Sequence, residues 1–296
     1  MKKALHILQH LRIPFSFFLL PVYIFALGIS PNIGEDQIIL SFVLLHFFIY
    51  PASNAYNSYF DKDEKSIGLI KKPPPVTIGL YYTSLVFDFI GIALAWMISM
   101  EFAILVFIYG LASKAYSHPG IRLKKYPWLG WFIAGFFQGV FTFYMAYVGI
   151  NGFGMELALK WKVIFPGLLT SFFLWGSYPM TQVYQHEEDN KRGDNTLSLL
   201  LGIKGTFLFT LIVFLLATLG FEYYFLNYHN EQIAISFLLF MSPTVLYFLI
   251  WFALVHRNEK FANFGWTMGL NLISAICLNA FFVYFFLKIS HIGQLN

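Results

Sequence analysis

Long apolar runs without charged residues recur along the whole chain, and no other feature restricts its fold as strongly. About 20 mostly apolar residues suffice for a helix to cross the hydrocarbon core of a bilayer. Of the 296 residues, 58% are hydrophobic and only 11% are charged, whereas about 25% of a soluble domain is charged. This composition excludes a soluble enzyme and a disordered chain. The single cysteine, Cys277, excludes a disulfide-stapled secreted domain.

The apolar runs predict an all-α integral membrane protein, a bundle of about nine transmembrane helices that forms one polytopic domain over residues 1–296. The expected spans are 14–33, 37–59, 76–99, 101–117, 128–150, 163–184, 205–226, 232–254 and 265–287. The fourth is the least regular, because Lys114 shortens its uncharged part. A secretory signal peptide is not expected, since the first apolar run is long and no small-residue cleavage pattern follows it.

The basic residues predict how the bundle is oriented. With nine spans, every Lys and Arg except Lys160, Lys162 and Lys288 lies in segments on one side of the membrane. The positive-inside rule assigns that side to the cytoplasm, so the N-terminus is expected inside and the C-terminus outside. We therefore expect a multi-pass integral membrane protein, in the cell membrane if the source is bacterial. The net charge of +4 follows from this topology, and no nucleic acid partner is expected.

Acidic residues on the predicted cytoplasmic side gather in two segments, and the first lies at the end of the second span. Asn54, Asn57 and Asp61 are spaced so that a continuing helix would place them on one face, and Asp63 and Glu64 follow. Amide and carboxylate oxygens are hard ligands that suit Mg²⁺. This ion is usually held by one or two carboxylates together with substrate phosphates.

The second acidic segment follows the sixth span and carries similar side chains. Gln185 and Asp189 are one helical turn apart with Glu188 between them, and Lys191 and Arg192 follow, as a phosphate-binding element would require. Four membrane crossings separate the two segments, which returns both to the same face and suggests an internal duplication of a four-helix unit. Two facing clusters are predicted to hold Mg²⁺ ions bridged by a diphosphate, whose charge the metal would neutralise as it leaves.

Two other interpretations of these residues stay open. Acidic loop residues are usually solvated, and lysines next to spans can simply anchor lipid headgroups. Oxygen-rich metal clusters also occur in ion transporters, although that class requires ionisable residues near the bilayer midplane. Asp88 is the only charge that we expect inside a span. We expect it to pack against another helix or to be a protonated carboxyl.

Both acidic segments resemble motifs of the UbiA-type family of intramembrane prenyltransferases. The family pattern Asn-Asp-x-x-Asp-x-x-x-Asp is similar to residues 57–65, which read Asn-Ser-Tyr-Phe-Asp-Lys-Asp-Glu-Lys. The family's second pattern, Asp-x-x-x-Asp-x-x-x-Gly-x-x-Thr-Leu, is similar to residues 185–197. Between them, a Tyr-Ser pair followed by a basic stretch with Pro and Gly resembles residues 115–130. The principal matching positions are Asn57, Asp61, Tyr116, Asp189, Gly193, Thr196 and Leu197.

The resemblance implies Mg²⁺-dependent transfer of a prenyl group from a prenyl diphosphate to a lipophilic, aromatic acceptor, as in quinone-type lipid biosynthesis. The active site would face the cytoplasm. The residues it assigns to Mg²⁺ are Asn57, Asp61, Asp63, Glu188 and Asp189. The residues it assigns to the diphosphate are Arg122, Lys124 and Lys191. The catalytic set would be Asn57, Asp61, Asp189 and Tyr116. Tyr116 would stabilise the allylic carbocation by cation–π attraction.

Three positions depart from the family patterns. Ser58, Lys65 and Gln185 stand where the family commonly has Asp. They leave the number of Mg²⁺ ions open. They also leave open a second interpretation, in which the chain is a catalytically silent relative that binds a lipid or a partner protein. A transporter is a third and weaker interpretation.

Overall fold

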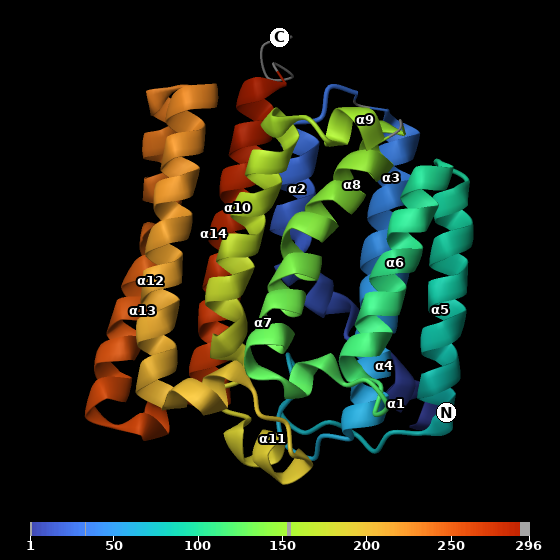
Figure 1. Cartoon of the computed structure of the whole chain (residues 1–296), viewed down its shortest axis with the longest axis vertical. Coiled ribbons are helices and arrows are strands. Elements are labelled where there is room, and N and C mark those ends of the chain that lie inside the picture. The colour runs from blue at the N-terminus through green and yellow to red at the C-terminus, as the bar shows by residue number, and fades with distance from the viewer. Residues whose placement is uncertain (1, 33, 153–154, 291–296) are drawn as a thin grey trace.

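The computed structural model describes residues 2–32, 34–152 and 155–290 and shows an all-helical bundle (Figure 1). The α-helices are α1 Lys2–Leu11, α2 Leu20–Gly28, α3 Glu35–Val43, α4 Tyr50–Asp61, α5 Ile78–Trp96, α6 Met100–Ser117, α7 Pro127–Phe136, α8 Thr142–Asn151, α9 Met155–Ala158, α10 Trp161–Ser177, α11 His186–Arg192, α12 Leu197–Tyr228, α13 Glu231–Arg257 and α14 Phe264–Ile289. Short 3₁₀ or π segments are η1 Ile13–Phe18, η2 Leu44–Ile49, η3 Leu123–Lys125, η4 Phe137–Phe141, η5 Tyr178–Thr181 and η6 Glu259–Phe261. The all-α prediction is confirmed.

Eight helical segments of the described chain are long and apolar enough to cross a membrane, and a bent pair near the N-terminus makes nine if it counts as one span. This confirms the prediction of about nine spans. The eight are Glu35–Asp61, Ile78–Trp96, Met100–Ser117, Pro127–Asn151, Trp161–Thr181, Leu197–Tyr228, Glu231–Arg257 and Phe264–Ile289. They run side by side, with α1 at one end of the bundle and the last turn of α14 at the other (Figure 1). The four-helix duplication stays a prediction.

The first span is not the single straight helix that its apolar run predicts. Its two parts, Lys2–Phe18 and Leu20–Gly28, meet at an angle of 42°. Arg12 has a left-handed backbone with φ of 45°, and Pro14 and Pro21 lie in the first turns of the helices that follow. Proline lacks the backbone donor that would continue the preceding helix and clashes with its last turn. The chain therefore leaves regular helical geometry at Arg12 and bends by 42° between Phe18 and Leu20.

The seventh span begins earlier than predicted. Thr196 caps α12, because its Oγ1 accepts a hydrogen bond from the backbone N–H of Leu199 at 3.5 Å. Gly202, with φ of 66°, then kinks the helix in its second turn, and only glycine adopts this conformation at little cost. The predicted span starting at residue 205 therefore missed the first two turns of α12, residues 197–204, which lead out of the second acidic segment.

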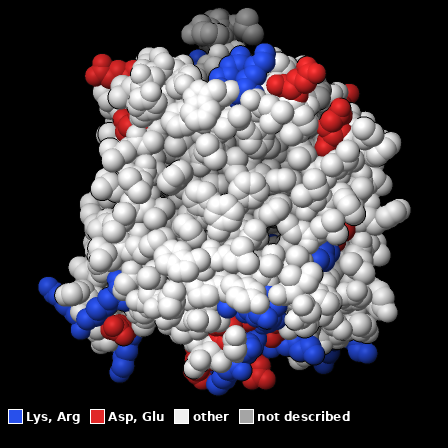
Figure 2. Space-filling model, in the orientation of Figure 1, with Lys and Arg blue, Asp and Glu red and all other residues white. Residues whose placement is uncertain are grey.

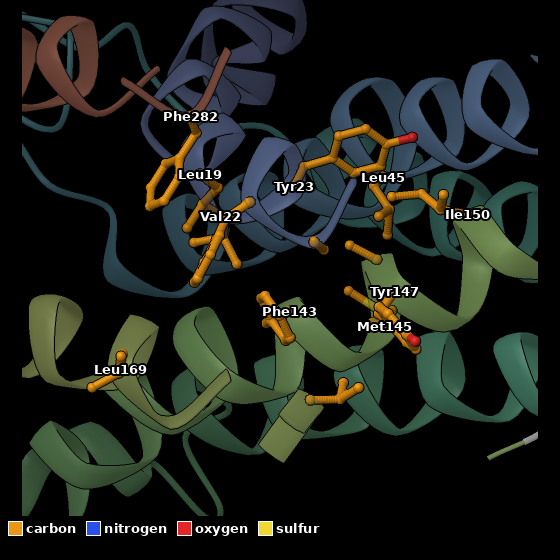
Figure 3. Packing of buried hydrophobic residues seen from close by; sticks show 14 of the residues in the cluster. Leu19, Val22, Tyr23, Leu45, Phe143, Met145, Tyr147, Ile150, Leu169 and Phe282 are labelled. Carbon is orange, nitrogen blue, oxygen red and sulfur yellow. The ribbon is translucent and has the colours of Figure 1, made fainter. Parts of the chain in front are cut away.

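Aromatic side chains from several helices build the core, part of which Figure 3 shows. Phe25 of α2 is fully buried, and its ring centroid lies 4.5 Å from that of Phe282 in α14 and 5.4 Å from that of Phe143 in α8. Lipid tails are as apolar as these side chains, so close packing rather than exclusion of water holds such helices together. Gly139 permits one close approach, since a Cβ there would lie 2.4 Å from the Cα of Ser171.

Charged side chains lie mainly at the two ends of the bundle, with a broad and largely uncharged belt between them (Figure 2). Inside the bundle, Asp88 of α5 pairs with Lys114 of α6. The expectation that Asp88 is the only charge inside a span is therefore wrong, because Lys114 belongs to the span Met100–Ser117. The expectation that Asp88 packs against another helix is confirmed. A buried carboxylate requires such a partner.

Candidate active site

A polar cavity of about 240 Å³ lies at the end of the bundle that carries α1 and α11. Segments far apart in the sequence form its walls, namely the ends of α4 and α6, η3, η5, α11 and the start of α14. Asn57, Asp61 and Asp63 of the first acidic segment and Asp189 and Asp194 of the second line it. The structure thus brings the two acidic segments to one cavity, as their spacing predicts.

The first acidic segment keeps its helical spacing to the end. Helix α4 runs to Asp61, and Lys62 ends it with φ of 51°. Asn54, Asn57 and Asp61 therefore lie on one face, and all three line the cavity. Asn57 donates from Nδ2 to the Oγ of Ser117 at 2.9 Å. This bond fixes the amide against α6 and leaves its carbonyl oxygen available as a ligand.

The second acidic segment forms α11, a short helix outside the spans. Gly193 ends it in the left-handed conformation, with φ of 73°. The backbone N–H of Asp194 donates to the carbonyl of Asp189 at 2.9 Å. The Oγ1 of Thr196 donates to Oδ2 of Asp189 at 3.5 Å. The Gly and Thr of the matched pattern thus end one helix and begin the next, and together they hold Asp189 at the cavity.

Two basic residues tie the carboxylate of Asp61 to the wall of the cavity. Lys124 in η3 pairs with one carboxylate oxygen of Asp61, and Arg122 lies 3.4 Å from the other. Arg122 also donates two hydrogen bonds to Asp194, at 2.6 and 2.7 Å. The loop between α6 and α7 therefore supplies cations to both acidic segments.

Arg192 contributes a third cation and contacts three carboxylates. Its guanidinium pairs with Asp63, with Asp189 at 2.5 Å and with Asp194 at 3.3 Å. All these carboxylates already have basic partners. Among the residues that the structure describes, no three His, Cys, Asp or Glu side chains are arranged to hold a metal ion by themselves.

Burial and the neighbouring charges shift the pKa values of these carboxyls in opposite directions. Burial raises the pKa of Asp189 to about 6. Burial and the nearby charge of Asp61 also raise the pKa of Asp63. Burial alone would raise the pKa of Asp194, but hydrogen bonds from Arg122 and the charge of Lys124 outweigh it and lower that pKa. Asp189 therefore gains a proton more easily than Asp194 does.

Three residues that the resemblance assigned to the site do not line the cavity. Arg122 pairs with Asp61 and Asp194 instead. Lys191 is exposed and pairs with Glu187 at 2.8 Å. Glu188 is buried, but its Oε1 accepts hydrogen bonds from the backbone N–H groups of Glu64 and Lys65, at 3.1 and 2.8 Å. It therefore joins the two acidic segments, whereas Arg192, next to Lys191, reaches the cavity.

Tyr116 lines the cavity, and its hydroxyl contacts that of Tyr178. The sequence interpretation did not select Tyr178, Gln138 or Asn271, which line the cavity as well. Polar amides in the middle of apolar spans are a signal that could have found Gln138 and Asn271. Tyr178 gave no such signal, because tyrosines near span ends usually belong to the interfacial belt. Arg12 also lines the cavity, and its Nε is buried without a hydrogen-bond partner within the described ranges.

An apolar cavity of about 380 Å³ adjoins the polar one. Residues of α10, α12, α13 and α14 form most of its lining, and Leu and Phe are the commonest side chains among them. Both cavities share a set of wall residues that includes Asn54, Tyr109, Gln138, Tyr178 and Asn271. The two together form a site with a charged end and an apolar end inside a bundle of membrane-spanning helices. This defines a membrane-embedded protein whose site suits an amphipathic ligand.

Comparison with known proteins identifies the family. The sequence model of the UbiA prenyltransferase family matches residues 16–273. The chain therefore belongs to the UbiA prenyltransferase family, as its motifs predict. Comparison with curated proteins gives no match.

Solved structures agree on the fold. The apo structure of a UbiA homologue from Aeropyrum pernix K1 is similar with a TM-score of 0.70 and 20% identity, over 92% of this chain and 98% of that one. A UbiA homologue from Archaeoglobus fulgidus bound to GPP and Mg²⁺ has a TM-score of 0.67 and 19% identity, over 95% and 99%. A structure of digeranylgeranylglyceryl phosphate synthase has a TM-score of 0.61 and 22% identity, over 96% and 98%.

Proposed function

We propose that this protein transfers a prenyl group from a prenyl diphosphate to a lipophilic, aromatic acceptor in a Mg²⁺-dependent reaction. The observation that carries the proposal is that the two cavities adjoin and share wall residues, one being lined by carboxylates and bases and the other mainly by apolar side chains. A prenyl diphosphate is divided in the same way into a charged head and an apolar tail. The relatives from Archaeoglobus fulgidus that were solved with GPP and Mg²⁺ and with DMAPP and Mg²⁺ support it.

The donor set of the cavity fits Mg²⁺ that is shared with a diphosphate. Mg²⁺ needs one or two carboxylates when substrate phosphates complete its shell, and Asn57, Asp61 and Asp189 offer hard oxygens from both segments. Asp63 is a further ligand candidate. Bound there, Mg²⁺ would neutralise charge on the leaving diphosphate. Glu188 is a weaker candidate, since it holds the backbone of the first acidic segment.

The basic side chains would bind the diphosphate, and an aromatic ring would stabilise the carbocation. Lys124 and Arg122, which pair with Asp61 and Asp194 in this structure, would turn to the diphosphate oxygens when the donor binds. Lys191 would need to give up its exposed pair with Glu187 to join them. Departure of diphosphate leaves an allylic carbocation, which the ring of Tyr116 would stabilise by cation–π attraction. The apolar cavity would exclude the water that otherwise quenches it.

The distribution of Lys and Arg residues gives the proposed orientation of the protein in the membrane. The end of the bundle with the polar cavity also carries the Lys and Arg residues that the positive-inside rule assigns to the cytoplasm. The donor would then enter from the cytoplasmic face with its tail in the apolar cavity. An acceptor of the quinone-precursor type would reach the same site from the membrane.

A catalytically silent, lipid-binding relative is the second candidate, and one feature favours it. Lys65 stands at a family Asp position and is engaged with Glu187, and every carboxylate of the first acidic segment that lines the cavity has a basic partner. Such a protein would bind the prenyl diphosphate without releasing diphosphate.

The test uses proteoliposomes with the full chain, labelled geranyl diphosphate, Mg²⁺ and a panel of phenolic and quinol acceptors. We expect diphosphate release that requires Mg²⁺ and is abolished by Asp61→Ala and by Asp189→Ala. Asp36→Ala, an exposed aspartate in the first turn of α3, is the matched control and should retain full turnover.

The outcomes separate the two candidates. Full turnover in both site variants would contradict the proposed site. Tight donor binding without diphosphate release for any acceptor would support the silent relative instead.

A further inference from the structure

Arg192 occupies the point where the two acidic segments meet. Each nitrogen of its guanidinium has a different carboxylate partner: Nη1 contacts Asp63, Nη2 lies 2.5 Å from Asp189 and Nε lies 3.3 Å from Asp194. Asp63 belongs to the first acidic segment, and the other two belong to the second. One cation thus joins both segments, as a bridging metal ion would.

These three ion pairs are largely buried and use all three nitrogens of the guanidinium. The side chains of Asp63 and Asp189 are each 7% exposed and that of Asp194 is 2% exposed, whereas Arg192 is 20% exposed. A guanidinium presents its donors in a fixed plane and cannot lose its proton at physiological pH, so it acts as a permanent cation. Oxygens that accept its hydrogen bonds are not free to complete the octahedral shell that Mg²⁺ demands.

Arg192 and a second Mg²⁺ would compete for the same carboxylates. The three positions where the family commonly has further Asp residues carry no carboxylate in this chain. Ser58 is buried, and its Oγ has no hydrogen-bond partner in the part of the chain that the structure describes. Lys65 is a second cation and pairs with Glu187. Gln185 lines the cavity, but its Nε2 donates to the carbonyl of Ser66 at 3.4 Å. The second acidic segment therefore has no other carboxylate in the cavity with which to bind a metal ion of its own.

Asp61 differs from these residues. It does not contact Arg192, and its partners come from the loop between α6 and α7. The amide of Asn57 lies on the same helical face, one turn away. An ion held by Asp61, Asn57 and two diphosphate oxygens would leave the contacts of Arg192 intact.

We propose that the Arg192 guanidinium takes the place of one of two divalent cations, so that the protein binds a single Mg²⁺ for each prenyl diphosphate. The Mg²⁺ lies at Asp61 and Asn57, and Arg192 meets the diphosphate from the side of α11. Asp189 then acts through Arg192 rather than as a metal ligand. This inference rests on the proposed function and narrows its metal ligands to Asp61 and Asn57, without Asp189.

The experiment counts metal ions directly. The full chain in lipid nanodiscs is titrated with Mn²⁺ in place of Mg²⁺, with and without the non-hydrolysable geranyl thiodiphosphate, and bound Mn²⁺ is counted by electron paramagnetic resonance. We expect one Mn²⁺ per chain in the presence of the donor analogue. We expect two in Arg192→Gln, because that change frees the carboxylates of Asp63 and Asp189, whereas Arg122 still holds Asp194. Arg192→Lys keeps the positive charge but loses the planar set of guanidinium donors. This variant should bind one Mn²⁺ and hold the analogue roughly tenfold more weakly.

Arg257→Gln is the matched control, because Arg257 is an exposed arginine at the end of α13, and it should bind one Mn²⁺ with unchanged analogue affinity. Two Mn²⁺ in the unmodified protein, or spin–spin coupling between them, would overturn the inference while the proposed function stood. One Mn²⁺ in Arg192→Gln would also overturn it, since the freed carboxylates would then not form a site. If no protein bound the analogue at any Mn²⁺ concentration, the proposed function would fail and the inference with it. The count in the unmodified protein decides even if a variant does not fold.

Discussion

The two acidic segments meet at one cavity, but different forces hold them in place. The first lies on α4, whose preceding turns are packed inside the bundle, so that Ala52 and Ala55 are completely buried. The second lies on α11, a helix of seven residues outside the spans. A helix that short is not stable by itself. Arg192, Gly193 and Thr196 supply the ion pairs, the turn and the cap that keep it ordered.

This difference predicts different tolerance to change. Packing positions Asp61, so its carboxylate is free to act on a ligand without being needed to hold the segment. Asp189 both lines the cavity and holds its own segment through Arg192 and Thr196. Changes to Asp61 should therefore act mainly on chemistry, and changes to Asp189 should affect chemistry and the order of α11 together.

The largest effect is expected from removing the charge of Asp61. Asp61→Asn removes the carboxylate that we propose as a Mg²⁺ ligand, and a bound metal ion contributes several kcal/mol of charge stabilisation in the transition state. We expect kcat/KM for prenyl transfer to fall roughly 10²- to 10³-fold. Asp189→Asn should cost less, about tenfold, because Asp63 and Asp194 still hold the Arg192 guanidinium through which Asp189 acts. Steady-state kinetics of both variants measure this, and equal losses would contradict the contrast between the segments.

The pH dependence should report mainly on Asp189. Its ionised carboxylate holds Arg192 at the cavity, so donor affinity should fall as pH drops through the Asp189 pKa of about 6, by up to about tenfold for each further pH unit. Stability of the ligand-free protein should change in the opposite direction. A carboxyl whose pKa is higher when folded than the unfolded value of 3.8 holds its proton more tightly in the folded state, so stability falls as pH rises from about 4 through 6. Binding and thermal unfolding between pH 5 and 8 test both trends, and Asp189→Asn should flatten them.

A smaller effect is expected at the residues that end the two helices. Lys62 and Gly193 both have left-handed backbones, with φ of 51° and 73°. A Cβ at Gly193 would meet nothing within 4 Å, so Gly193→Ala tests the backbone alone and should cost about 1 kcal/mol. Lys62→Gly should stabilise α4 by a similar amount, because it removes the same strain. Thermal unfolding of the two variants should shift in opposite directions, and shifts of the same sign would show that contacts, not backbone strain, dominate.

The fold was predictable because its strongest signal is local. Each apolar run predicts one membrane span independently of the rest of the chain. In this all-α bundle, the backbone must be helical where it crosses the lipid, because its polar groups find no other hydrogen-bond partners there. The predicted bounds and shapes of spans were wrong where single residues determine how a helix begins or breaks. Pro14 and Pro21 break the first span, and Thr196 starts α12 before its apolar run begins.

The site was predictable only in part, because sequence spacing does not give the direction of long side chains. The face shared by Asn57 and Asp61 follows from helical geometry, and it holds. Lys191 and Arg192 are adjacent and chemically alike, but neighbouring residues on a helix point in different directions. Only Arg192 reaches the cavity. Nothing in the sequence of α11 fixes its rotation, which its contacts with the first segment determine.

The smallest effect is expected at the exposed contact between the segments. Glu187 pairs with Lys65 of the first segment and with Lys191 of its own helix, and these charges lower its pKa to about 2. Exposed pairs of this kind contribute little because water and salt screen them. Glu187→Gln should therefore change donor affinity by less than about twofold. The comparison with Asp189→Asn, two residues further along the same helix, is the sharper measurement. If Glu187→Gln weakened donor binding as much as Asp189→Asn does, surface charge rather than the buried contacts of Arg192 would hold α11 against the first segment.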